Sequence, residues 1–403
     1  MADVLSSDNH NARGTRDIRV AAEMNCVSAK LWLRYRSTPT NLSVWFRPIR
    51  AGSIPDPPLP HTRAMISWFR TLTGFDERDY ADTQSRLRVV GDRLHSLVNG
   101  GSWGIGHLET PSLAELRARV AALPAQVGAG VRVRNVVADA YALHLQPAVR
   151  GALVQVASQF NLLEMASPRA TPELGVGVYD FDPTQGPACA RAAGAATVYR
   201  NYFVPVQGQL GQTRDRQLNM LADLCAVLPG GEGIVMQNGY ALTDAASLRR
   251  IRSALRACSE AERDALRQRL RIGLVWDAQV TAPGAVPEQR VCQAFCSALP
   301  VTYNDEQDPA LWREFALLVL EAAYEATLLA GVLNAARPGG SRSVYLTLVG
   351  GGAFGNERAW ILAAIERALG VVAGMGLEVT VVHYPQVAGE FAARFPTTKS
   401  HNQ

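Results

Sequence analysis

The feature that most constrains the fold is a glycine cluster late in the chain, VYLTLVGGGAFGN (Val344–Asn356). An apolar, β-branched run leads into it, and the following ERAWILAAIERAL has the apolar spacing of a helix. This order predicts a strand, a tight loop and a helix, the basic unit of an α/β fold. Gly350, Gly352 and Gly355 also match the pattern G-x-G-x-x-G, which occurs in dinucleotide-binding folds.

The rest of the chain extends this pattern. After Pro124, short β-rich runs such as GLVWDAQVT and GLEVTVVHY alternate with helical stretches such as 309–335. Strands separated by helices indicate an α/β domain with a mostly parallel sheet and helices on both faces. We therefore predict a disordered tail at 1–20, a mainly helical region at 21–125 and an α/β domain at 126–403. In the helical region, Ser112 and Glu115 form a capping box that predicts the start of a helix.

Composition excludes several classes of protein. The net charge is +4 over 403 residues, and the arginines are dispersed among acids, so no nucleic-acid surface is expected. No signal peptide is visible and no run reaches the ~20 apolar residues of a membrane span, which favours a cytoplasmic protein, with a secreted effector as the alternative. The six cysteines lack C-x-x-C spacing and nearby histidines, so no metal is expected.

The glycine cluster does not fit a Rossmann domain. Such a domain places an acid at the end of the next strand to hold the ribose, but the next strand here ends in His383-Tyr384-Pro385. The glycines still allow the backbone to approach a ligand closely, and the N–H groups at the following helix start favour an anion such as a pyrophosphate. A tight turn with no ligand is the alternative.

A second polar cluster lies upstream, in YDFDPTQGPACARAAGA. If this segment is extended, Asp180 and Asp182 share a face, and the turn that follows leads into a helix of small residues. Such residues allow close packing around a ligand loop. Ordinary turn chemistry, with Asp182 as a helix cap, is the alternative reading.

Taken together and in order, several segments resemble macrodomains, the ADP-ribose-binding α/β fold. These segments are VVADAYAL, GALVQVASQFN, TQGPACARAAGA, VCQAFCSALPVTY and SVYLTLVGGGAFGN. The resemblance implies that Asp139 binds adenine, Asn161 binds the distal ribose, and Gln185 and Gly186 belong to the catalytic loop, where only Gly186 of the family's glycine run survives. It assigns the diphosphate to Gly350, Gly351, Gly352, Ala353, Phe354, Gly355 and Asn356.

The departures from the common pattern resemble the divergent MavL-type branch of macrodomains. That branch removes ADP-ribose from arginine side chains, including those of modified ubiquitin. The resemblance therefore implies a hydrolase whose partner is an ADP-ribosylated protein, with ubiquitin as one example, and ADP-ribose as ligand or product in place of a cofactor.

Hydrolysis at the anomeric carbon needs a carboxylate to stabilise positive charge or to activate water. We predict Asp182 for this role, ahead of Asp180, with Asp277 as a competing strand-end acid. Glu325 lies in an apolar helix and is expected to be a paired structural acid. A module that binds ADP-ribose without cleaving it is the first alternative function, and an NAD-dependent oxidoreductase is the second.

Overall fold

The structure is a computed structural model that describes residues 67–124 and 130–397. These residues belong to one compact unit, Ile66–Gln403. The predicted tail at 1–20 and the first part of the predicted helical region, 21–66, lie outside the described residues.

A seven-stranded sheet with the order β4-β11-β12-β6-β13-β14-β5 forms the centre of the unit. The five strands from β12 to β5 run parallel, whereas β11 is antiparallel to both of its neighbours. In chain order the strands are β4 (His107–Glu109), β5 (Arg132–Val137), β6 (Leu153–Ala157), β11 (Gly273–Gln279), β12 (Arg290–Cys296), β13 (Ser343–Leu346) and β14 (Glu378–His383).

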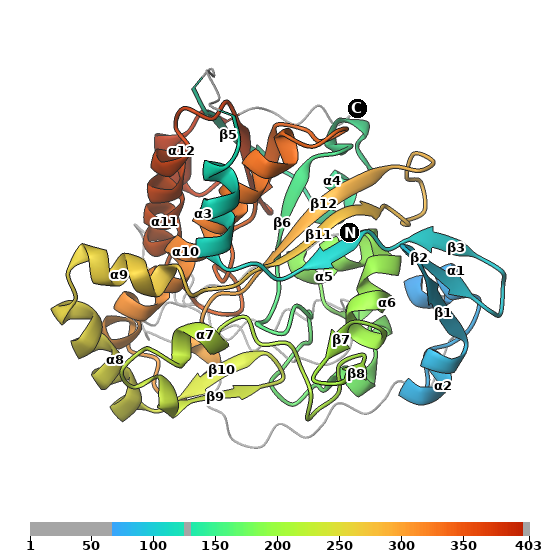
Figure 1. Cartoon of the computed structure of the whole chain (residues 1–403), viewed down its shortest axis with the longest axis horizontal. Helices are drawn as coiled ribbons and strands as arrows, with labels where there is room; N and C mark the ends of the chain where they lie inside the picture. The colour runs from blue at the N-terminus through green and yellow to red at the C-terminus, as the bar shows by residue number, and fades with distance from the viewer. Residues whose placement is uncertain (1–66, 125–129, 398–403) are drawn as a thin grey trace, which may run out of the picture. The chain divides into compact units, whose positions relative to one another are not determined.

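Helices cover both faces of this sheet (Figure 1). Gln155 of β6 donates to Thr327 of α10, whereas Gln293 of β12 donates to the carbonyl of Cys189 in α5, which lies on the opposite face. α3, α8, α9 and α11 pack around α10. The helices are α1 (Trp68–Thr73), α2 (Tyr80–Ser85), α3 (Leu113–Ala121), α4 (Ala140–Leu145), α5 (Gln185–Ala192), α6 (Gly194–Tyr202), α7 (Ala222–Cys225), α8 (Ala245–Ala257), α9 (Glu260–Arg267), α10 (Pro309–Ala335), α11 (Arg358–Val371) and α12 (Gly389–Arg394).

The predicted fold class, a mixed and mostly parallel sheet flanked by helices, is confirmed. Shorter elements lie at its margins. They are the hairpin strands β1 (Leu87–Val90), β2 (Arg93–Ser96), β3 (Ser102–Gly104), β7 (Pro205–Val206), β8 (Gln209–Leu210), β9 (Ile234–Gln237) and β10 (Tyr240–Thr243), and the 3-10 turns η1 (Pro147–Val149), η2 (Pro172–Leu174), η3 (Gly177–Phe181), η4 (Gly231–Gly233) and η5 (Val301–Tyr303).

The helical prediction for the front region is wrong at residues 87–104. This segment forms the antiparallel sheet β1-β2-β3, and Gly91 supplies a positive φ of 58° at the first turn. Leu87 and Leu94 are buried in a cluster with Phe69 and Phe75. The local spacing indicates a helix, but a short hairpin can bury one of its faces against that cluster. This burial favours the hairpin.

The end of the front region belongs to the α/β layers. β4 pairs with β11 at the edge of the main sheet, and α3 packs against α10. The capping box predicted at the start of α3 is confirmed, because the side chains of Ser112 and Glu115 each accept a hydrogen bond from the other residue's backbone N–H.

One helix among the described residues, α10, has the length and apolar composition of a membrane span. However, 94% of its most apolar window is buried inside the protein. A helix that is apolar on all sides and enclosed by other elements is typical of a domain core. α10 is therefore the central core helix of this unit.

Candidate functional site

A cleft of about 360 Å³ lies at the carboxyl ends of the parallel strands. Its lining comes from the segments that follow β6, β13 and β14, and from the start of α5. In open α/β sheets, ligands bind at this edge, where successive connections leave the sheet in opposite directions. The cleft brings together the two polar clusters that the sequence places far apart, because Asp182 to Gly186 and Gly350 to Phe354 line the same space.

The glycine loop presents several unused backbone donors to this cleft. Among the described residues, no acceptor takes a hydrogen bond from the N–H of Gly350, Gly352, Ala353 or Phe354. Successive free N–H groups in a loop form a concave anion-binding surface. Gly350 has a φ of 77°, in the left-handed region that a glycine adopts without strain.

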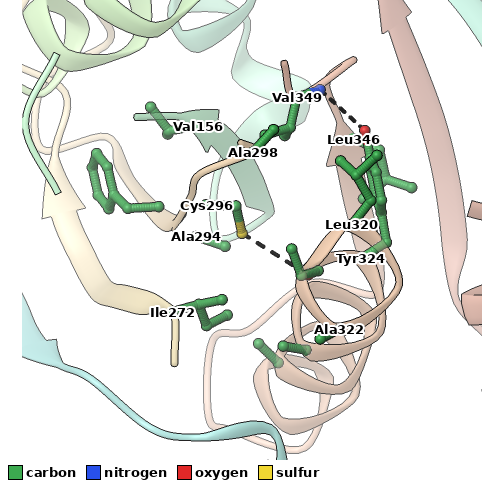
Figure 2. Packing of buried hydrophobic residues seen from close by; sticks show 14 of the residues in the cluster. Val156, Ile272, Ala294, Cys296, Ala298, Leu320, Ala322, Tyr324, Leu346 and Val349 are labelled. Carbon is green, nitrogen blue, oxygen red and sulfur yellow. Dashed lines mark hydrogen bonds between the residues drawn. The ribbon is translucent and has the colours of Figure 1, made fainter. Parts of the chain in front are cut away.

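Buried polar side chains hold the strand that leads into this loop. The hydroxyl of Tyr324, in α10, donates to the carbonyl of Thr347 at 2.7 Å and accepts from the N–H of Val349 at 3.0 Å. Figure 2 shows Tyr324 and Val349 joined in this way within the apolar core. On the neighbouring strand, Gln155 accepts from the N–H of Thr347 at 3.1 Å. These hydrogen bonds therefore fix the position of the backbone where the glycine loop begins.

Asn356 closes the loop from the other end. Its N–H donates to the carbonyl of Gly350 at 2.9 Å, and its side-chain amide donates to the carbonyl of Leu299 at 2.8 Å. Neither Gly355 nor Asn356 lines the cleft. At Gly355, where φ is 73°, a β carbon would lie 2.4 Å from Thr302, so this glycine serves the turn itself.

Arg358, the first residue of α11, lines the cleft beside the glycine loop. Within the described part of the chain, its guanidinium has no hydrogen bond and no ion pair. A cation at a helix N-terminus opposes the helix dipole, and the preceding Glu357 does not cap the helix. An unpaired arginine in this position, next to four free N–H groups, is suited to an anionic ligand.

The opposite wall is the start of α5. Thr184 precedes this helix without capping it through its side chain, so the N–H groups of Gln185 and Gly186 have no acceptor within the described residues. Gln185 uses its side-chain oxygen to accept from the N–H of Ala140 at 2.7 Å, which ties α5 to α4. Asp182 stands beside them and accepts from the N–H of Thr184 at 2.8 Å.

Glu164 is a second carboxylate in the cleft, one that sequence reasoning missed. It is 2% exposed, and Arg200 donates to both of its oxygens at 3.2 to 3.3 Å. Burial raises the pKa of Glu164 to about 7, Arg200 counteracts part of this effect, and the charge of Asp182 adds to it. A carboxylic acid with a pKa near neutrality can both donate and accept a proton under working conditions.

Three aromatic rings gather at the end of the cleft near Asp182. The ring centroid of Phe354 lies 5.3 Å from that of Tyr240 and 5.6 Å from that of Tyr303. All three line the cleft; burial raises the pKa of both tyrosines, and the charge of Asp182 adds a smaller contribution. Phe354 thus packs with two cleft residues, and its predicted place in a diphosphate-binding loop stays a prediction.

Besides Gly355 and Asn356, four predicted site residues do not line the cleft. Asn161 is fully buried and donates to Gln217 at 2.8 Å, because β6 ends at Ala157 and the turn directs Asn161 toward the β9-β10 hairpin. Asp139 caps α4 through the N–H of Ala142, although its neighbour Ala140 contacts Gln185. Their predicted contacts with ribose and adenine remain untested.

Asp180 and Asp277 lie apart from Asp182 for different reasons. Asp180 is in the 3-10 turn η3, not in an extended segment, and it accepts from Arg191 at 2.9 Å and from the N–H of Trp68 at 3.0 Å. Asp277 lies near the carboxyl end of the antiparallel strand β11, at a register shift between Val275 and Ala278, and this end of β11 lies at the opposite edge of the sheet from the cleft. There it pairs with Arg337.

The cleft residues that were not predicted from the sequence are marked there only by weak local features. Glu164 is the single acid in the apolar run FNLLEM, and Arg358 is a basic residue in the first turn after the glycine loop. His383 ends the last strand, Tyr384 follows it, and both line the cleft. The described residues contain no group of three His, Cys, Asp or Glu side chains placed to hold a metal ion.

No protein-family model and no curated protein matches this sequence. Similar solved structures include poly(ADP-ribose) glycohydrolase from Thermomonospora curvata, at 16% identity and a TM-score of 0.40, and its complex with the inhibitor ADP-HPD, at 15% and 0.38. A point mutant of the same enzyme gives 13% and 0.39. Each match covers 78% of this chain and 96% of the other. Similarity this low carries no inference about activity.

Proposed function

We propose that this protein is a hydrolase that releases ADP-ribose from modified protein side chains, with arginine-linked ADP-ribose as its substrate. The observation that carries the proposal is a single cleft in which a surface of free anion donors faces two carboxylates. The free N–H groups of the glycine loop and the guanidinium of Arg358 are suited to the two phosphates. The resemblance of the sequence to macrodomains is the basis for proposing ADP-ribose as the bound nucleotide. The MavL-type features are the basis for proposing the arginine linkage.

The two acids line the same cleft as the glycine loop, and the distal ribose would lie beside them. Hydrolysis breaks the bond between the anomeric carbon and a guanidine nitrogen through a transition state resembling an oxocarbenium ion. Asp182, which is partly exposed, would stabilise this charge and orient the attacking water. Glu164, with its raised pKa, would give a proton to the departing nitrogen.

The arginine linkage adds a demand that the site can meet. Asp182 uses one oxygen for the N–H of Thr184 and retains the other, which can accept a charged hydrogen bond from the substrate guanidinium. Holding the phosphates at one end and the guanidinium at the other would fix the anomeric carbon between them. Good orientation of this kind contributes roughly 7 to 11 kcal/mol to catalysis.

The test is release of ADP-ribose from arginine-modified and serine-modified proteins. We expect release from the arginine substrate, with a loss of about 100-fold or more for Asp182→Asn and for Glu164→Gln. Asp277→Asn is the matched control, because Asp277 lies outside the cleft at a φ of 57°, which asparagine tolerates. Tight binding of ADP-ribose without release from either substrate would instead identify a reader module.

A further inference from the structure

A second depression, of about 550 Å³, adjoins the cleft. It lies among the segment 168–171, the loop 207–219 and the hairpin β9-β10, and its lining is rich in amide side chains. Arg169 and Arg214 are both exposed there, and within the described residues neither guanidinium has a hydrogen bond or an ion pair. Asp215 is the one carboxylate in the lining.

The depression and the cleft share two walls. In the first wall, Gln159 and Met165 line the cleft, whereas Arg169 lines the depression. In the second, Tyr240 lines the cleft and Asn238 lines the depression. Hydrogen bonds join these walls, because the hydroxyl of Tyr240 donates to the carbonyl of Met165 at 2.6 Å and Asn238 donates to the carbonyl of Pro168 at 2.7 Å.

The floor of the depression is held in place by buried amides. Gln217 accepts from Asn161 at 2.8 Å and donates to Asn238 at 2.8 Å. Asn161, which does not line the cleft, thus supports the surface next to it. A surface held in this way loses little conformational entropy when a ligand binds.

The depression also adjoins the part of the cleft that lies near Asp182. Tyr240 belongs to the aromatic group near Asp182, where the bond to the carrier protein would emerge. Chain on either side of a modified arginine would therefore pass over this adjoining surface.

We propose that this depression binds an acidic segment of the carrier protein, with Arg169 and Arg214 pairing with its carboxylates; this rests on the proposed function. Guanidinium groups pair with carboxylates through two parallel hydrogen bonds, and the surrounding amides can hydrogen-bond an extended backbone. The site would thus select substrates by the sequence around the modified residue.

Two arginine-ADP-ribosylated peptides of equal length, one flanked by glutamates and one by lysines, test the proposal. For the wild type we expect kcat/KM for ADP-ribose release to favour the acidic peptide by roughly threefold for each arginine, about tenfold in all. The difference should appear in KM. Arg169→Glu/Arg214→Glu should abolish it and leave the affinity for free ADP-ribose unchanged. Arg88→Glu is the matched control and should keep the preference, because Arg88 is an exposed arginine on β1 that has no partner among residues 67–124 and 130–397.

An unchanged preference in the double variant, or a wild-type preference for the basic peptide, would overturn the proposal. Fluorescence anisotropy with the unmodified acidic peptide separates this proposal from the proposed function. If neither modified peptide is cleaved but the unmodified acidic peptide binds through Arg169 and Arg214, the hydrolase assignment fails and the acidic-segment site stands. If the acidic peptide is cleaved but its affinity does not depend on these arginines, the hydrolase assignment stands and the acidic-segment site fails.

Discussion

Gly186 packs so closely against Ala157 that a β carbon on Gly186 would lie 2.1 Å from the carbonyl oxygen of Ala157. This contact places the first turn of α5 directly on the end of β6. It thereby sets the position of Asp182 and Gln185 relative to the sheet, and it explains why glycine occupies this position.

Gly186→Ala should therefore displace the start of α5. Because the obstacle is a backbone oxygen, we expect a loss of about 1 to 3 kcal/mol in the free energy of unfolding, together with a loss of ADP-ribose affinity. Gly352→Ala is the matched control, since no atom lies within 4 Å of its added β carbon. Its stability should stay within about 0.5 kcal/mol of the wild type. Equal stability of the two variants in chemical denaturation would contradict the packing argument.

Arg358→Ala should change binding and stability in opposite directions. Loss of a charged hydrogen-bond donor should weaken ADP-ribose binding by about 10- to 100-fold in calorimetry. Removing a cation from the N-terminus of α11 should raise the free energy of unfolding of the unliganded protein by about 0.3 to 1 kcal/mol. Unaltered affinity would mean that the phosphates lie elsewhere.

Glu164 should make stability depend on pH. Its pKa is raised from 4.5 to about 7 in the folded protein, so the stabilisation due to its protonation is full below about pH 4.5 and is lost as the pH rises through 7. The amide in Glu164→Gln does not titrate. The wild type should therefore lose up to about 3 kcal/mol relative to the variant between pH 4.5 and 8, measured by urea denaturation. A pH-independent difference would show that Glu164 stays ionised beside Arg200.

The same pKa predicts the pH dependence of catalysis. If Glu164 gives a proton to the leaving nitrogen, kcat for ADP-ribose release should fall above about pH 7. The residual activity of Glu164→Gln should lack this alkaline limb, whereas that of Asp182→Asn should keep it. An alkaline limb that survives in Glu164→Gln would assign the proton transfer to another group.

Glu325 should be important for stability and not for binding. It is fully buried in α10, where it accepts from Arg117 of α3 at 2.6 Å and from Arg367 of α11 at 2.5 Å. Glu325→Ala would leave two guanidinium groups without this partner, at a cost of about 3 to 5 kcal/mol in the free energy of unfolding. Glu260→Ala, which removes a carboxylate that is 71% exposed, should cost less than about 1 kcal/mol. Similar losses of stability in the two variants would contradict the argument that burial makes the ion pairs of Glu325 important.

Local features of the sequence were sufficient for several elements of this fold. The capping box of Ser112 and Glu115 starts a helix because its hydrogen bonds span three residues. The helix over Pro309–Ala335 and the strand before the glycine loop also follow from local composition and spacing. The strands after Pro124 are found where their β-branched runs occur.

The cleft depended on contacts between distant residues. Asp277 lies within β11 and not at its end, and the antiparallel direction of β11, which no local pattern records, takes it to the far edge of the sheet. The pKa of Glu164, which lies in the loop after β6, depends on burial and on Arg200 of α6. Outside residues 87–104, the sequence alone therefore determined which of these segments form strands, helices and a glycine loop, because those choices depend on near neighbours. Only the tertiary structure decided which acids face the loop, because that depends on strand order, strand direction and burial.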